Sequence, residues 1–111
     1  MKVSIITVCY NSADTIEDTI VSILDQSYSD IEYIIIDGKS KDNTLEVIEK
    51  YRDRVSTVIS EKDNGIYDAL NKGIRLCSGE IIGILNADDF YIDKNVIGDI
   101  VSVMQKEETD S

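Results

Sequence analysis

The sequence contains no histidine and only two cysteines among its 111 residues. Without histidine, the chain has no imidazole that could ligate zinc or act as general base in a Ser-His-Asp or Cys-His enzyme. Cys9 and Cys77 lie far apart in no CxxC spacing, so we interpret both as reduced core residues. Any chemistry must therefore use carboxylates, amides, hydroxyls, lysines or a metal held by oxygen.

Positive charge and long apolar runs are also scarce. Eleven Lys and Arg stand against 22 Asp and Glu, which gives a net charge of −11. Such a chain is a poor match for an extended phosphate backbone, so we expect no nucleic acid partner. No stretch approaches the roughly 20 apolar residues of a membrane span, and the first residues lack a signal-peptide layout. We expect one cytoplasmic domain over residues 1–111.

Apolar runs typical of buried strands alternate four times with segments of helical spacing. The pattern predicts strands over residues 3–9, 31–36, 55–60 and 81–85. It predicts helices over 13–26, about 45–51, from 66 to a closing Gly79, and over 96–104 before a polar tail at 106–111. Ser12 or Asp14 is available to cap the first helix. This alternation predicts an α/β fold of three layers, α/β/α, around a mainly parallel sheet.

Polar residues follow each predicted strand, at the edge where ligands bind in parallel sheets. Asn86-Ala87-Asp88-Asp89 is the most informative of these segments. Two adjacent carboxylates repel each other unless a cation or hydrogen-bond donors compensate them. Mg²⁺ or Mn²⁺ commonly takes one or two protein carboxylates, with waters and substrate phosphates as the remaining ligands. The alternative is that Asp88 or Asp89 only caps the next turn.

The other strand ends also allow two interpretations. Asp37 could hydrogen-bond a ribose or a base edge, or accept amide bonds from its own turn. Tyr10 could stack on a nucleobase or be a half-buried packing residue. Asp63 could line a site or be an ordinary turn acid. The glycine-rich phosphate loops GxxxxGK[ST] and GxGxxG are absent, so any phosphate must be held in another way.

Four segments in order resemble the motifs of family 2 glycosyltransferases: residues 3–11 (VSIITVCYN), 37–44 (DGKSKDNT), 63–73 (DNGIYDALNKG) and 79–89, which ends in LNADD. The resemblance covers essentially the whole chain. It implies a Rossmann-like GT-A fold, a nucleotide-sugar donor, most simply a UDP-sugar, and a divalent Mn or Mg ion. It also implies inverting transfer of the sugar to an acceptor hydroxyl, on a glycan or a lipid-linked sugar.

The resemblance assigns roles by position on the base and ribose side. Tyr10 and Asn11 resemble residues beside the base, and Asp37 resembles an acid that contacts base or ribose. Gly38 replaces the second acid of the family's Asp-Asp-Gly-Ser motif, and Lys39 follows it. Asp63, together with Asn71, resembles residues that line the donor side of the cleft.

The same resemblance assigns the metal side. Asn86-Ala87-Asp88 stands where the family usually has Asp-x-Asp. Asp88 therefore resembles the metal-binding carboxylate, with Asp89 as a second candidate, and Asn86 would hydrogen-bond the ribose. The family's general base and most of its acceptor pocket lie farther along the chain than residue 111.

We therefore interpret the chain as the donor-binding part of a glycosyltransferase that binds nucleotide-sugar with little or no transfer by itself. We expect apolar surface beside the fourth strand to favour self-association, and the full-length protein to lie at a membrane periphery. Two other classes stay open. A Mg²⁺-dependent receiver or phosphoryl-transfer domain would need acids after the first strand, where the chain has Cys9-Tyr10-Asn11. A non-catalytic interaction module would bind no nucleotide in a metal-dependent way.

Overall fold

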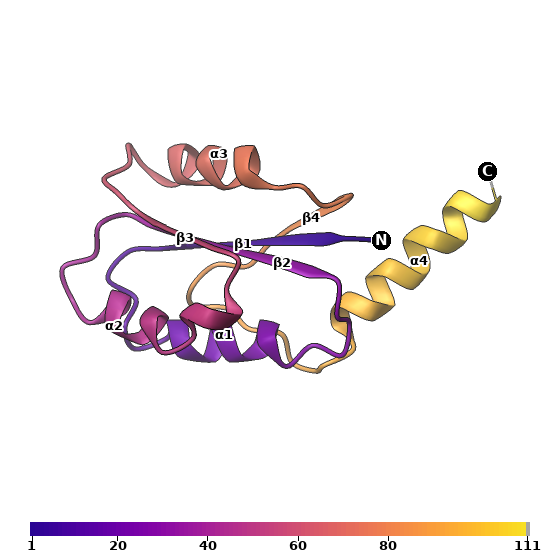
Figure 1. The fold of residues 1–111 in the computed structure, drawn as a ribbon, viewed down its shortest axis with the longest axis horizontal. Coiled ribbons are helices and arrows are strands. Elements are labelled where there is room, and N and C mark those ends of the chain that lie inside the picture. Colours follow the sequence, from indigo (N-terminus) through magenta and orange to yellow (C-terminus); the bar gives the residue numbers. More distant parts are fainter. Residues whose placement is uncertain (111) are drawn as a thin grey trace.

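A four-stranded parallel sheet forms the centre of the computed structural model, which describes residues 1–110, with side chains through residue 106. The strands are β1 (Val3–Cys9), β2 (Ile31–Asp37), β3 (Thr57–Ser60) and β4 (Ile81–Ile84), in spatial order β3-β2-β1-β4. Helices α1 (Ile16–Leu24) and α2 (Thr44–Glu49) lie on one face, and α3 (Ile66–Leu76) lies on the other (Figure 1). The predicted α/β/α layers around a parallel sheet are confirmed.

The two central strands are buried because helices cover both of their faces. On the side of α1 and α2, β-strand residues such as Ile5 and Ile35 pack in one cluster with Ile16 and Ile20. On the side of α3, a smaller cluster joins the residues Ile6, Ile34, Ile36 and Ala69. Consecutive β-branched residues in β2 are therefore buried on alternate faces, as expected for a central parallel strand.

Helix α3 lies unusually close to β1 at Gly73. A Cβ atom built on this glycine would lie 2.7 Å from Cγ2 of Ile6, which is closer than real carbon atoms approach. Gly73 itself is buried. A glycine is therefore required here for the helix backbone to rest on the strand.

The strand order reverses between β1 and β4. From β1 the chain proceeds through α1, β2, α2 and β3 toward one edge of the sheet, and then crosses by α3 to β4 on the other side of β1. Because right-handed crossovers in opposite directions lie on opposite faces, α3 is separated from α1 and α2. Such a reversal opens a crevice at the carboxyl ends of the strands.

Several predicted element boundaries were wrong. Helix α1 begins at Ile16 and has no side-chain cap, so neither Ser12 nor Asp14 serves as expected. A short 3-10 turn, Arg52–Arg54, precedes β3, which delays the strand to Thr57. Helix α3 ends at Leu76, and Gly79 instead packs against β1, where a Cβ would lie 2.6 Å from Ser4 Oγ.

The last helix, α4 (Val96–Asp110), runs through the segment predicted as a polar tail and extends away from the sheet (Figure 1). Its first turn is capped by a distant side chain, since Ile97 N donates to Oε1 of Gln26 at 3.0 Å. No helix in the described part of the chain combines the length and apolar character required to cross a membrane.

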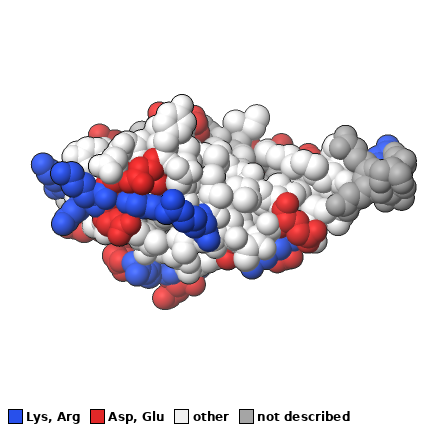
Figure 2. Space-filling model, turned by 90° about the horizontal axis from the view of Figure 1, so that it is seen from above, with Lys and Arg blue, Asp and Glu red and all other residues white. Residues whose placement is uncertain are grey.

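Strand β4 is an edge strand with exposed apolar side chains. Ile82 and Ile84 are 45% and 49% exposed, which confirms the expected apolar surface beside this strand. Seen from the side of α3, Lys and Arg side chains lie next to acidic ones, and a broad uncharged area extends toward α4 (Figure 2). Self-association through the β4 edge remains a prediction.

Candidate functional site

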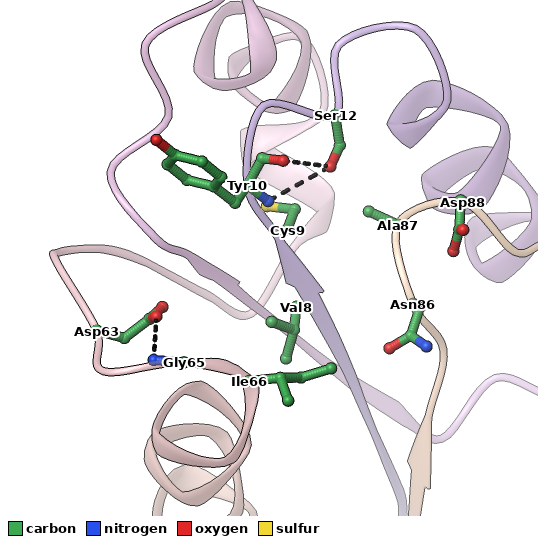
Figure 3. A pocket seen from close by; sticks show the side chains of 10 residues that line it. All are labelled: Val8, Cys9, Tyr10, Ser12, Asp63, Gly65, Ile66, Asn86, Ala87 and Asp88. Atoms are coloured by element: carbon green, nitrogen blue, oxygen red, sulfur yellow. Dashed lines mark hydrogen bonds between the residues drawn. The ribbon is translucent and has the colours of Figure 1, made fainter.

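An open pocket of about 510 Å³ lies where the strand order reverses. Its walls come from the end of β1, the loop between β3 and α3, and the segment after β4 (Figure 3). The lining residues are Val8, Cys9, Tyr10, Ser12, Asp63, Gly65, Ile66, Asn86, Ala87 and Asp88.

Four of the residues predicted for a nucleotide or metal site meet in this pocket: Tyr10, Asp63, Asn86 and Asp88. They come from three separate loops, so the fold brings together what the sequence places up to 78 positions apart. Val8 and Ile66 form apolar walls of the pocket and were not predicted as site residues. Nothing in the sequence pattern separates these two residues from ordinary core positions.

The pocket has two chemically different sides (Figure 3). The ring of Tyr10 and the carboxylate of Asp63 lie on one side, whereas Asn86 and Asp88 lie on the other. Tyr10 is 54% exposed, so its ring is open to a ligand. An aromatic face on one side and a carboxylate on the other are suited to a ligand with a flat ring at one end and a metal-binding group at the other.

Asp37 lies outside this lining and has a different environment. Its side chain is 0% exposed. It accepts hydrogen bonds from Ser40 N at 2.9 Å, from Ser60 Oγ at 2.8 Å and from the hydroxyl of Ser40. The thiol of Cys9 also donates to it, at 3.5 Å, and burial together with the negative charge of Asp37 raises the pKa of Cys9. The carboxylate thus accepts hydrogen bonds from its own turn, through Ser40, and also from β1 and β3, while its contact with a base or ribose stays a prediction.

Asn11 is likewise occupied by protein contacts. Its backbone has a φ of 48°, in the left-handed region that Asn tolerates better than most residues. Its N–H donates to Ser40 Oγ, and its Oδ1 accepts from Lys41 N, each at 2.8 Å. Asn11 therefore holds the loop after β1 against the loop after β2.

Two further contacts complete this connection. Ser12 N donates to Thr44 Oγ1 at 2.8 Å, and Ala13 N donates to Asp42 Oδ2 at 3.3 Å. Asp42 also accepts from the hydroxyl and N–H of Thr44, and the Thr44 hydroxyl is the main cause of a lowered pKa for Asp42. We call the contacts of Asn11, Ser12 and Ala13 with residues 40–44 the loop clasp. It anchors the chain directly after Tyr10 to the loop that follows β2.

Hydrogen bonds to backbone atoms hold the segment after β4, and the carboxylates of Asp88 and Asp89 take no part in them. Asp89 N donates to Asn86 O at 3.0 Å, and the buried Thr19 hydroxyl donates to Ala87 O at 3.0 Å. Within residues 1–110, neither the Asp88 nor the Asp89 carboxylate has a hydrogen bond or an ion pair. The alternative that one of these side chains caps the next turn is therefore not what the structure shows. Asp89 does not line the pocket.

Asp88 could supply one ligand to a divalent ion, but the described residues could not coordinate such an ion by themselves. The described residues contain no group of three or more Asp, Glu, Cys or His side chains that could hold a metal. Asp88 is exposed at the pocket, and its carboxylate oxygens have no hydrogen-bond partner among the described residues. One such carboxylate, with phosphate and water oxygens, is a common arrangement for Mg²⁺ and Mn²⁺.

Comparison with known sequences decides the family. The profile described as Glycosyl transferase family 2 matches residues 4–111. The chain belongs to glycosyltransferase family 2. It is 38% identical over 101 residues to the Escherichia coli UDP-Glc:alpha-D-GlcNAc-diphosphoundecaprenol beta-1,3-glucosyltransferase WfaP, covering 88% of this chain and 39% of WfaP. The curated relatives are thus much longer than this chain.

Solved glycosyltransferases share the fold. Residues 1–349 of S. aureus TarS, in complex with UDP-GlcNAc, match with a TM-score of 0.87 and 27% identity, over 96% of this chain and 32% of that one. The mannosyltransferase PcManGT from Pyrobaculum calidifontis, in complex with GDP-Man and Mn²⁺, matches with a TM-score of 0.83 and 26% identity, over 90% and 31%. The GT-A assignment is confirmed, and the receiver-type alternative is set aside.

Proposed function

We propose that this family 2 chain is the donor-binding part of a glycosyltransferase that binds a nucleotide-diphospho-sugar together with a divalent metal. Tyr10 and Asp63 would face the nucleoside, and Asn86 and Asp88 would face the ribose, diphosphate and metal. The pocket that joins these four side chains carries the proposal. The complexes of TarS with UDP-GlcNAc and of PcManGT with GDP-Man and Mn²⁺ support it.

The charge of the site supports a role for a cation. The chain has a net charge of −11, and two acids, Asp63 and Asp88, line the pocket. A diphosphate entering this field is repelled unless a positive charge compensates the acids. A divalent ion held by Asp88 would supply that charge, and it would also offset the negative charge that develops on the leaving diphosphate during transfer. Asp88 would hold the ion, and Asn86 would offer an uncharged amide to the ribose.

For the whole protein we propose inverting transfer of the sugar to an acceptor hydroxyl, in the synthesis of a polysaccharide or glycolipid. WfaP, by its name, acts on a lipid-linked sugar, which supports such an acceptor and a position at the membrane periphery. The chain spans about two-fifths of the length of WfaP. We place the general base outside residues 1–111, so this chain by itself should bind donor and transfer little or no sugar.

Calorimetric titration tests the binding proposal. UDP, GDP and their sugar conjugates are titrated into the chain with and without Mn²⁺, and into the Asp88→Asn and Asp89→Asn variants. We expect binding that requires Mn²⁺ and falls at least about tenfold in Asp88→Asn, because that variant loses the charge at the metal. Asp89→Asn removes an equal charge outside the pocket and should bind like the parent chain. Absence of metal-dependent binding would instead favour a non-catalytic module.

A further inference from the structure

Gly38 and Asp63 meet at the side of the pocket opposite Asp88. A Cβ built on Gly38 would lie 2.9 Å from Oδ2 of Asp63 and 3.5 Å from Cδ1 of Tyr10. The carboxylate of Asp63 therefore occupies the space that a side chain at position 38 would need. This contact links the end of β2 to the loop after β3, and places an acid beside the exposed Tyr10 ring (Figure 3).

Asp63 has one oxygen in use and one oxygen free. Its Oδ1 accepts from Gly65 N at 3.2 Å, which fixes the direction of the side chain. No hydrogen bond within the described chain involves Oδ2. The other nearby acid, Asp37, has its oxygens saturated by Ser40 and Ser60. Asp63 is thus the carboxylate with acceptor capacity on the Tyr10 side of the pocket.

From this geometry we propose that Asp63, seated against Gly38, selects the nucleobase of the donor. The inference rests on the proposed function. A base that stacks on Tyr10 would turn its hydrogen-bonding edge toward Asp63, and an ionised carboxylate can only accept hydrogen bonds. Uracil presents the ring N3–H, and guanine presents N1–H with an amino group. At that ring position cytosine and adenine have a nitrogen that only accepts, and their donor is the neighbouring amino group, so a carboxylate facing the ring position meets a lone pair instead of an N–H. Asp63 therefore favours bases with a ring N–H over cytosine and adenine.

Gly38 controls this selection because it determines where Asp63 can lie. Adding a methyl group at position 38 forces the carboxylate away, and this movement costs little stability because the atom displaced is the end of a flexible side chain. Gly38→Ala should therefore fold and still bind nucleotide, but with a changed preference among bases. A role of Asp63 in stability alone would not alter that preference.

The experiment measures dissociation constants of UDP, GDP, CDP and ADP with Mn²⁺ for the parent chain and four variants. Asp63→Asn replaces one acceptor oxygen that faces the nucleobase with an N–H donor, and Gly38→Ala displaces the Asp63 carboxylate. Asp53→Asn is the charge control on an exposed turn, and Gly98→Ala is the glycine control, with no atom within 4 Å of the added Cβ.

The parent chain should bind UDP or GDP at least about tenfold more tightly than CDP and ADP, and the UDP and GDP arms identify which base it takes. In Asp63→Asn and Gly38→Ala this ratio should fall to about threefold or less, whereas both controls keep it. Equal affinities in the parent chain, or an unchanged ratio in Asp63→Asn, would overturn the inference while leaving the proposed function intact. Absence of binding by all four nucleotides would overturn both.

Discussion

The last residue of β2 and the segment after β4 each present an aspartate at the end of an isoleucine-rich strand, yet the two side chains have opposite environments. Asp37 is fully buried and accepts hydrogen bonds from Ser40, Ser60 and Cys9. Asp88 is exposed and accepts none within the described chain. The difference teaches that an acid at a strand end is structural when neighbouring loops supply donors, and is available to a ligand when they do not.

The largest effect expected from this comparison is on stability at Asp37. Asp37→Ala removes a fully buried acceptor of several hydrogen bonds and leaves the donors of Ser40, Ser60 and the buried Cys9 thiol without this partner, so it should destabilise the fold by about 3 kcal/mol or more. Urea unfolding followed by circular dichroism measures this loss. The matched Asp88→Ala variant should stay within about 0.5 kcal/mol of the parent chain. An equal loss of unfolding free energy in Asp37→Ala and Asp88→Ala would contradict the difference drawn between these two aspartates.

The second effect is on stabilisation by ligand. A nucleoside diphosphate with Mn²⁺, at one hundred times its dissociation constant, should stabilise the parent chain by about 2.7 kcal/mol. Asp88→Ala should keep the melting temperature of the free chain but lose most of the rise on adding UDP or GDP with Mn²⁺. Removing Mn²⁺ with a chelator should produce the same loss in the parent chain. A full ligand-induced rise in Asp88→Ala, measured by thermal unfolding, would remove Asp88 from the metal site.

A smaller effect is expected from the backbone of the β2 loop. Lys39 is exposed and has a φ of 65°, a conformation that disfavours residues with a Cβ. Lys39→Gly should therefore stabilise the chain, by up to about 1 kcal/mol. Lys41→Gly is the matched control, since Lys41 does not have a positive φ, and it should be destabilising. A loss of stability in Lys39→Gly would show that its side chain makes a compensating contribution.

The smallest effect is a pH dependence in the loop clasp. The Thr44 hydroxyl and the N–H groups of Thr44 and Ala13 lower the pKa of Asp42 in the folded state. A lowered folded pKa means that Asp42 stabilises the fold above about pH 4, and that this contribution is lost as the pH falls through the folded pKa. The difference in unfolding free energy between the parent chain and Asp42→Ala should be constant from about pH 7 to 5 and shrink below about pH 4.

Thr44→Val tests the cause of that dependence. This variant lacks the hydroxyl that contributes most to the lowered pKa of Asp42. Its unfolding free energy should therefore vary less with pH between about pH 4 and 2 than that of the parent chain, whatever its absolute stability. An identical pH profile would assign the lowered pKa to the backbone donors.

The sequence was sufficient to predict the sheet and the edge at which the pocket forms. Buried parallel strands are continuous β-branched runs, and their polar ends meet at one edge whatever the details of packing. The meeting of Tyr10, Asp63 and Asp88 at one edge follows from those two facts, whereas the strand order β3-β2-β1-β4 was not predicted. This is why the family motifs and the pocket agree.

Long-range donors and close approaches could not be predicted in the same way. The saturation of Asp37 depends on Ser60, which is 23 positions away, and the start of α4 depends on Gln26, 71 positions from Ile97. In the sequence Gly79 looks like a glycine that ends a helix, but in the structure it allows the chain to pass close to Ser4, where a Cβ atom would not fit. Each of these features depends on which loops become neighbours, and that is decided only when the sheet has formed.

The contact of Gly73 with Ile6 affects the width of the pocket, although Gly73 does not line it. Helix α3 begins at Ile66, a wall of the pocket, directly after the loop that carries Asp63. Because the helix moves as a rigid rod, a side chain at position 73 would lift its whole length from β1 and widen the gap between Asp63 and Tyr10. The width of the opening thus depends on Gly73, which lies two helical turns from Ile66 and does not line the pocket.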